Sequence, residues 1–169
     1  MKKNLILIGM MGAGKSTIGA ILAKNLNLNF IDVDKILEKK QSMTIQEIFA
    51  KKGEVFFRKI EEEETKKIVK MSNVVVALGG GAFLNEKVRK IIKKTCVSIW
   101  LNLRTSELYR RTIINKKRPL LSNIKNEKEL EKLYEERRKI YALSDHNIDC
   151  NYKDKNAIVK KIKIIYESQ

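Results

Sequence analysis

The sequence lacks a hydrophobic run long enough to cross a membrane. Its apolar stretches, such as Leu5–Ile8 and Val74–Leu78, fall far short of the roughly 20 residues that a spanning helix needs. The N-terminus, Met1–Asn4, is charged like that of a signal peptide, but the apolar stretch after it is short and leads directly into glycines and Lys15. We therefore expect a cytoplasmic protein with no part in a membrane.

Cysteine, histidine and proline are scarce. The two cysteines, Cys96 and Cys150, are far apart and form neither a CxxC pair nor a metal-binding spacing, so we expect free thiols. The single histidine, His146, has no neighbour at ligand spacing, which argues against a metal or acid–base role. The single proline, Pro119, lies in the basic and polar stretch 115–125, for which we predict a mobile loop.

Acidic residues are too few to balance the basic ones. The chain has 36 Lys and Arg residues against 20 Asp and Glu residues, which gives a formal net charge of +16. Such a charge could attract nucleic acid. However, the lysines are spread along nearly every predicted helix, as expected from a composition biased toward Lys, Asn and Ile. We therefore expect no nucleic-acid partner.

The sequence contains the material for one folded α/β domain. Its 169 residues are 43% hydrophobic, and short β-branched runs alternate with amphipathic segments of helical length. This alternation is typical of a parallel sheet covered by helices. We predict strands at 5–8, 29–33, 74–78, 97–101 and about 147–150. We predict helices at 15–26, from 44 to about 53, and at 55–70, 86–94, 106–113, 127–142 and 156–167.

The most specific motif is the segment 9–17, which reads GMMGAGKST and satisfies the pattern G-x-x-x-x-G-K-[ST]. It lies between a predicted strand and a predicted amphipathic helix, as a phosphate-binding P-loop requires. Glycines allow backbone N–H groups to surround a phosphate at the helix N-terminus. Lys15 can then contact the β- and γ-phosphates, while the Ser16 hydroxyl can bind Mg²⁺. The alternative, a glycine-rich turn with an incidental lysine, does not explain both flanks.

Two further strand ends carry residues suited to a site, because ligands of such sheets lie beyond the carboxyl ends of the strands. The predicted second strand leads into Asp32 and Asp34, of which one could hold a metal and the other could accept a hydrogen bond from an attacking hydroxyl. The alternative, that they cap a helix beginning near Lys35, is plausible for Asp34 alone. The third strand leads into the glycines 79–81, which would let the backbone approach a ligand or simply form a loose turn.

Together these motifs resemble the shikimate kinases, a branch of the P-loop NTPases with a nucleoside-monophosphate-kinase-like fold. The resemblance covers nearly the whole chain and rests on six ordered motifs. They are GMMGAGKST at 9–17, Asp32-x-Asp34, FRKIE at 57–61, LGGG at 78–81, RPLL at 118–121 and Arg137-x3-Tyr141. The resemblance implies a three-layer α/β/α fold with a five-stranded parallel sheet in the order 2-3-1-4-5. It also implies transfer of the γ-phosphoryl of ATP to the 3-hydroxyl of shikimate, in the biosynthesis of chorismate and the aromatic amino acids.

The resemblance further divides the chain and assigns roles to residues. It implies one kinase domain over 1–169, with the P-loop at 9–17, a substrate-binding subdomain at 33–61 and a lid at 112–125. Mg²⁺ would be held by Ser16 and Asp32. The implied ATP-binding residues are Gly12, Ala13, Gly14, Lys15, Ser16, Thr17, Arg111 and Arg118. The implied shikimate-binding residues are Asp34, Arg58, Gly80, Gly81 and Arg137, and the implied catalytic residues are Asp34, Lys15 and Arg118.

These implied roles agree with general chemistry. A planar guanidinium matches a carboxylate with two parallel hydrogen bonds, so Arg58 and Arg137 together could orient a small acid. Glu61 follows Arg58 by three residues on a predicted helix and could hold that guanidinium in place. The choice of Arg137 over Arg138 depends on the spacing to Tyr141. Without the resemblance, an exposed charged helix would be the simpler interpretation of both arginines.

Two other functions compete with this interpretation. Another small-molecule kinase of the same fold, for gluconate or a nucleoside monophosphate, would share the P-loop, but Asp32-x-Asp34, the three glycines and Arg58 argue against both acceptors. A nucleic-acid-binding module that uses the P-loop for regulation would explain the charge, and its affinity would fall steeply with salt. For the kinase we expect ATP and shikimate as the partners of a monomer.

Overall fold

The computed structural model describes residues 3–114, 124, 126–151 and 153–169. In chain order the elements are β1 (Asn4–Ile8), α1 (Lys15–Leu26), β2 (Asn29–Asp32), α2 (Val33–Gln41), α3 (Ile45–Ile68), β3 (Val74–Ala77), η1 (Ala82–Leu84), α4 (Glu86–Thr95), β4 (Cys96–Asn102), α5 (Thr105–Ile114), α7 (Glu127–Tyr141), β5 (His146–Asp149) and α8 (Lys155–Glu167). Among these described elements, no helix is long and apolar enough to span a membrane.

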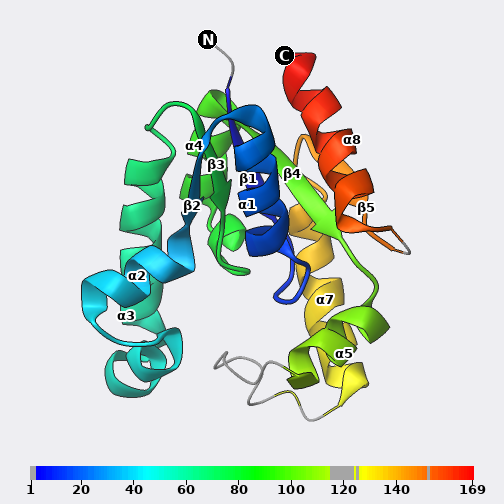
Figure 1. The fold of residues 1–169 in the computed structure, drawn as a ribbon. Coiled ribbons are helices and arrows are strands. Elements are labelled where there is room, and N and C mark those ends of the chain that lie inside the picture. The colour runs from blue at the N-terminus through cyan, green and yellow to red at the C-terminus, as the bar shows by residue number, and fades with distance from the viewer. Residues whose placement is uncertain (1–2, 115–123, 125, 152) are drawn as a thin grey trace.

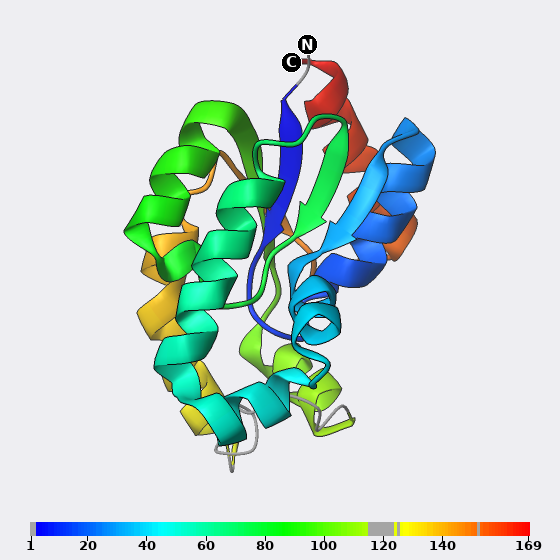
Figure 2. The same cartoon turned by 90° about the vertical axis from the view of Figure 1, so that its left-hand side faces the viewer.

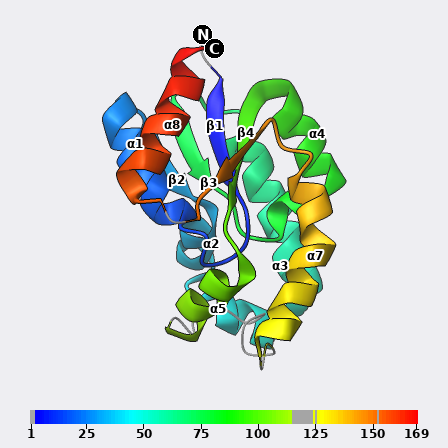
Figure 3. The same ribbon diagram turned by 90° about the vertical axis from the view of Figure 1, so that its right-hand side faces the viewer.

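The five strands form one parallel sheet in the order β2-β3-β1-β4-β5, which confirms the expected topology. Helices α1 and α8 cover one face, and α3, α4 and α7 cover the other, so that the sheet lies between two helical layers (Figures 1 and 3). Figure 2 shows the sheet from its edge, with α3 and α4 on one side of the strands and α1 and α8 on the other. All carboxyl ends of the strands therefore meet at one edge of the sheet, as a ligand site of this fold requires.

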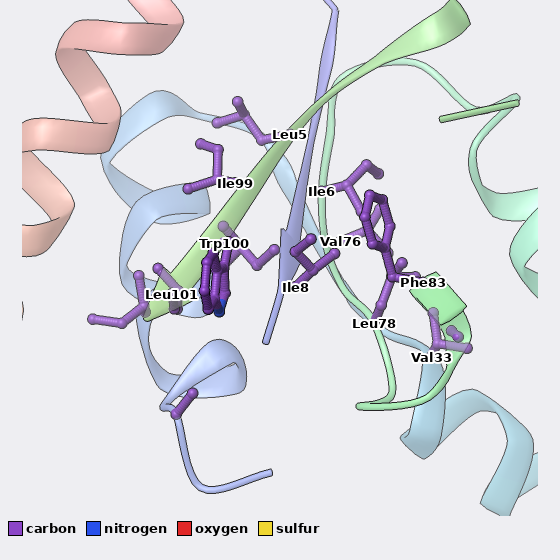
Figure 4. Close-up of a cluster of buried hydrophobic side chains, with 14 of the residues drawn as sticks. Leu5, Ile6, Ile8, Val33, Val76, Leu78, Phe83, Ile99, Trp100 and Leu101 are labelled. Carbon is purple, nitrogen blue, oxygen red and sulfur yellow. The ribbon is translucent and has the colours of Figure 1, made fainter. Parts of the chain in front are cut away.

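The core lies on both faces of the central strands. Every residue of β1 and β3 is buried, as continuous apolar strands covered on two sides should be. Side chains such as Leu5, Ile99, Ile6 and Phe83 fill the space between the sheet and the helices (Figure 4). Trp100 also belongs to this core.

Helix α2 is not among the helices predicted by range, although a helix beginning near Lys35 was considered as the alternative role of Asp32 and Asp34. The predicted strand ran to residue 33, whereas β2 ends at Asp32 and α2 begins at Val33. Asp32 is the N-cap of this helix, because its side chain accepts a hydrogen bond from the backbone N–H of Lys35. The capping role that we considered for Asp34 therefore belongs to Asp32, and Asp34 lies in the first turn of the helix.

Helix α3 is bent at Gly53, where the sequence predicted the end of a short helix. Thr44 begins α3 with a capping box, in which its hydroxyl and backbone both bond to Glu47. Gly53 then adopts φ 81° and ψ 168°, a conformation outside the helical region that an L side chain rarely adopts. The bend separates residues 45–52 from 54–68 and turns the first part over the carboxyl edge of the sheet (Figure 1).

The two ends of the described chain lie side by side. The backbone N–H of Lys3 donates a hydrogen bond of 2.8 Å to the side-chain oxygen of Gln169. Both ends lie at the top of Figure 1, whereas the loop between β1 and α1 lies at the opposite edge of the sheet. The termini are therefore far from the edge that carries the P-loop.

Candidate functional site

The loop between β1 and α1 has the backbone that its glycines predict. Gly12 and Gly14 have positive φ angles of 81° and 93°, and Gly14 is the N-cap of α1. Lys15 is the first residue of that helix and is buried, and its Nζ donates hydrogen bonds of 2.8 Å to Gly9 O and 2.9 Å to Met10 O. The ammonium group thus lies against the loop at a helix N-terminus, where a phosphate is favoured by the helix dipole and by unpaired N–H groups.

Ser16 and Asp32, the two residues implied to hold a metal, are in direct contact. The Ser16 hydroxyl donates a hydrogen bond of 2.5 Å to Oδ2 of Asp32. Ser16 lies in the first turn of α1, and Asp32 ends β2, two strands away from β1 in the sheet. The described residues contain no cluster of three His, Cys, Asp or Glu side chains that could hold an ion by themselves. Mg²⁺ commonly needs only one or two protein oxygens besides water and substrate phosphates, and this pair fits that requirement.

A pocket next to this loop contains all five residues that the resemblance implied for shikimate. Its polar wall is formed by Asp34, Arg58, Glu61 and Arg137. Gly79–Gly81 form a second wall, and the apolar part comes from Met11, Ile45, Phe49 and Phe57. The sequence interpretation assigned no role to the apolar side chains, because apolar residues on an amphipathic helix look the same whether they line a pocket or fill a core.

Arg58 is fixed from several sides. Its Nη1 donates a hydrogen bond of 2.7 Å to Glu61, as the three-residue spacing predicted, and its Nε and Nη2 each lie 3.2 Å from Glu54. Its guanidinium also lies 5.2 Å from the ring centroid of Phe57. Burial opposes the charge of Arg58, but the carboxylates of Glu61 and Glu54 outweigh this effect and raise its pKa. The guanidinium is therefore held charged and oriented in the pocket.

Glu61 is the most buried charged residue of the pocket, with 2% of its surface exposed. Burial raises the pKa of Glu61, although the positive charge of Arg58 opposes the shift. Its Oε2 binds Arg58, while its Oε1 has no hydrogen-bond partner among the described residues. The negative charge of Asp34 also contributes to the raised pKa of Glu61, so the two carboxylates face the same region.

The glycine segment approaches these side chains closely. A methyl group at Gly81 would lie 2.6 Å from Cζ and 2.8 Å from Nη2 of Arg58. A methyl group at Gly79 would lie 2.5 Å from Oε1 of Glu61 and 2.7 Å from Oδ1 of Asp34. Since real Cβ contacts below 3.0 Å essentially never occur, these glycines leave the space in which the charged groups lie.

Arg137 belongs to the pocket, whereas Arg138 lies at the surface. Arg137 is 6% exposed, and its Nη1 lies 3.4 Å from Gly80 O, to which it donates a hydrogen bond. Arg138 instead pairs with Glu135, and both side chains of that pair are 53% exposed. Tyr141, one turn after Arg137 on α7, also donates to Gly80 O, at 2.5 Å. The spacing to the tyrosine thus singled out the arginine that faces the pocket.

Arg111 lies on the opposite side of the P-loop. Its Nη1 lies 3.4 Å from Gly12 O, and its Nε donates a 2.8 Å hydrogen bond to Glu107 one turn earlier on α5. The sequence interpretation missed Glu107, although its spacing of four residues to Arg111 is the signal of such a pair. Arg118 and most of the predicted lid at 112–125 lie outside the described residues.

The fold and the loop together define the class of the protein. A parallel sheet in the order 2-3-1-4-5 with a P-loop after its first strand is the architecture of the nucleoside-monophosphate-kinase-like P-loop NTPases. Solved structures with low sequence identity share this fold. One is the deoxyadenosine kinase from M. mycoides, with a TM-score of 0.63 and 17% identity over 98% of this chain and 100% of that one.

The family follows from more similar proteins. A family model described as shikimate kinase matches residues 11–166. A shikimate kinase from Sulfurihydrogenibium sp. is 38% identical over 160 residues, which cover 95% of each chain. A shikimate kinase from Acinetobacter baumannii, solved in complex with shikimate, has a TM-score of 0.94 and 32% identity over 99% of this chain and 94% of that one. The chain belongs to the shikimate kinase family and is therefore an ATP-dependent kinase.

Proposed function

We propose that the protein transfers the γ-phosphoryl group of ATP to the 3-hydroxyl of shikimate, giving shikimate 3-phosphate and ADP. The observation that carries this proposal is the pocket beside the P-loop, where Asp34, Arg58 and Arg137 face the glycines 79–81. Membership of the shikimate kinase family adds to it, because the acceptor is then a small hydroxylated acid. The reaction belongs to the biosynthesis of chorismate and the aromatic amino acids.

The two arginines of the pocket bind the carboxylate of the acceptor. Arg58 comes from α3 and Arg137 from α7, so that their guanidinium groups approach the pocket from different helices. Both side chains are at least partly buried, which strengthens a charge-assisted hydrogen bond to a carboxylate. Backbone groups of Gly80 and Gly81 contact the ring, and the apolar wall of Ile45 and Phe49 covers its carbon atoms.

ATP binds to the P-loop on the other side. Lys15 donates to two loop carbonyls, and phosphate oxygens are stronger acceptors for an ammonium group than these carbonyls. Residues 12–17 surround the phosphates, and Arg111 lies where its guanidinium can stack on adenine. Ser16 and Asp32 would hold Mg²⁺, which supplies positive charge to the phosphates when it is bound. Arg118 is proposed to complete the charge around the transferred group.

Asp34 orients the attacking hydroxyl. It lies in the first turn of α2, two residues after Asp32, and its carboxylate faces the pocket beside Gly79. Because phosphoryl transfer passes through a loose transition state, positioning and charge neutralisation contribute more than proton removal by a strong base. Asp34 therefore acts by holding the hydroxyl in line with the γ-phosphate and by accepting its proton as the bond forms.

We further propose that the protein acts as a monomer in the cytoplasm. The pocket and the P-loop to which we assign the reaction lie side by side in this chain. A role in nucleic-acid binding is not proposed, since the net charge alone favours it. Binding of the protein to nucleic acid at physiological salt, with an affinity that falls steeply as salt increases, would contradict this choice.

The test is ADP release by the purified protein with Mg²⁺-ATP and one acceptor at a time. Shikimate, gluconate, AMP and CMP are compared with a reaction that contains no acceptor. We expect release that depends on shikimate, together with a product phosphorylated at the 3-hydroxyl. Activity with another acceptor and none with shikimate would leave the nucleotide site intact but would refute the roles of Asp34, Arg58 and Arg137.

A further inference from the structure

The carbonyl oxygen of Gly80 accepts two hydrogen bonds from the same helix. The Tyr141 hydroxyl donates at 2.5 Å and Arg137 Nη1 donates at 3.4 Å. Tyr141 is completely buried, and its ring packs against Trp100 with a centroid distance of 5.9 Å. Burial raises the pKa of Tyr141, although the charge of Arg137 and a hydrogen bond with its side chain oppose the shift, so the hydroxyl keeps the proton that it donates. The short bond therefore belongs to a rigid side chain with a single donor.

The hydrogen bonds from Tyr141 and Arg137 to Gly80 O differ in length, and only Arg137 has a second role in the proposed function. An N–H···O bond is normally 2.7–3.2 Å long, so the contact from Arg137 is a weak one. Arg137 is also the residue that the proposed function requires for the carboxylate of the acceptor. A guanidinium that binds a carboxylate with two parallel bonds must direct its N–H groups away from a peptide carbonyl. Tyr141 can keep the carbonyl satisfied when Arg137 turns away.

We propose that Tyr141 is a positioning residue for the kinase reaction: its hydroxyl holds the Gly80 carbonyl, and this leaves Arg137 available to bind the acceptor's carboxylate. The inference rests on the proposed function. Without the hydroxyl, Arg137 would be the remaining side-chain donor to this buried carbonyl. Binding of the acceptor would then leave a buried carbonyl without a partner, which is costly.

The contacts around Gly80 indicate which substrate loses affinity when the Tyr141 hydroxyl is removed. A methyl group at Gly80 would lie 3.6 Å from the backbone nitrogen of Met11, so the glycine segment packs directly on the P-loop. Among the described residues, the Tyr141 hydroxyl contacts that loop through a 3.8 Å hydrogen bond to Sδ of Met10. Loss of the hydroxyl should therefore change the binding of the acceptor much more than the binding of ATP.

The first test is Tyr141→Phe, which keeps the ring on Trp100 and removes the hydroxyl. We expect the KM for shikimate to rise about 3- to 10-fold, the effect of one neutral hydrogen bond, while kcat and the KM for ATP change by less than about twofold. Tyr134→Phe is the matched control. Tyr134 lies on the same helix, and its hydroxyl donates a 2.8 Å hydrogen bond to Asn102, outside the pocket. It should change thermal stability without changing the KM for shikimate.

A double-mutant cycle tests whether Tyr141 acts through Arg137. Arg137→Lys alone should raise the KM for shikimate, and adding Tyr141→Phe should raise it by less than about twofold more. The inference would be overturned if Tyr141→Phe raised the KM for shikimate by the same factor in the wild type and in Arg137→Lys. It would also be overturned by an unchanged KM for shikimate in Tyr141→Phe or by an equal rise in Tyr134→Phe. A wild-type protein that shows no shikimate-dependent ADP release would instead refute the proposed function, so the two failures are distinguishable.

Discussion

Gly81 offers a substitution that should impair the acceptor site while leaving the backbone of the fold in place. It has φ −101° and ψ −16°, a conformation that alanine adopts without strain. Its added methyl group would, however, lie 2.6 Å from Cζ and 2.8 Å from Nη2 of Arg58. The obstructing atoms are the far end of a flexible side chain, so Arg58 should move away while the backbone stays in place.

The size of the effect follows from what Arg58 loses. A charge-assisted hydrogen bond contributes about 1.5–3 kcal/mol, and 1.4 kcal/mol corresponds to a factor of ten. If the displaced guanidinium forms one hydrogen bond to the acceptor instead of two, the KM for shikimate should rise about 10- to 100-fold. The free energy of unfolding should fall by about 1–2 kcal/mol, because the displaced guanidinium leaves the buried carboxylate of Glu61 without its partner, and this cost exceeds the gain of up to about 1 kcal/mol that alanine gives by restricting the unfolded chain.

Steady-state kinetics and chemical denaturation of Gly81→Ala measure both quantities. The KM for ATP is the internal control, since Gly81 lines the pocket on the acceptor side. The same substitution is then made in an Arg58→Ala background, where the methyl group meets no guanidinium. There it should have little further effect on the KM for shikimate. A persistent rise in that background would mean that the methyl group obstructs the substrate directly, and the reasoning about Arg58 would be wrong.

Three other substitutions test separate parts of the site. Asp34→Asn should lower kcat about 10²- to 10⁴-fold with little change in the KM for ATP, and an equal loss in both would contradict its assignment to the acceptor. Glu61→Gln tests the raised pKa of Glu61. Because the pKa of Glu61 is raised in the folded protein, this residue stabilises the fold less as the pH rises above its ordinary pKa of 4.5. The Tm of the wild type should therefore fall relative to the Tm of Glu61→Gln as the pH rises above 4.5. A relative gain of the wild type would refute this. Glu107→Ala should raise the KM for ATP about two- to fivefold, because the Nε of Arg111 loses its hydrogen-bond partner. An unchanged KM for ATP would contradict the assignment of Arg111 to the nucleotide site.

The strands and most helices could be predicted because their apolar periodicity and end signals agree. The bend at Gly53 was visible for the same reason, since a capping box came before it and another amphipathic run came after it. The start of helix α2 was placed too late, near Lys35, because its nine residues begin directly after β2, without a loop between them. A strand that passes directly into a helix shows no change of composition at the boundary, and Val33 fits either element.

The candidate site was predictable where residues act through local spacing and not where they act across the fold. The bond between Arg58 and Glu61 follows from a separation of three residues on one helix. The contact between Tyr141 and Gly80 joins residues that are 61 positions apart. Nothing in the sequence shows that a hydroxyl on α7 reaches a carbonyl after β3. Such contacts depend on how the helices pack against the sheet, which the pattern of either segment alone does not specify.

The hydrogen bond between Lys3 and Gln169 has a consequence for protein engineering. Because the two ends of the described chain lie side by side and far from the P-loop, a short linker could join them without deforming the domain. New ends could then be opened in an exposed turn such as the one that includes Asn73, which precedes β3. A circular permutant of this kind should keep the phosphate-binding edge intact. It would also show that this domain folds independently of the order in which its strands are connected.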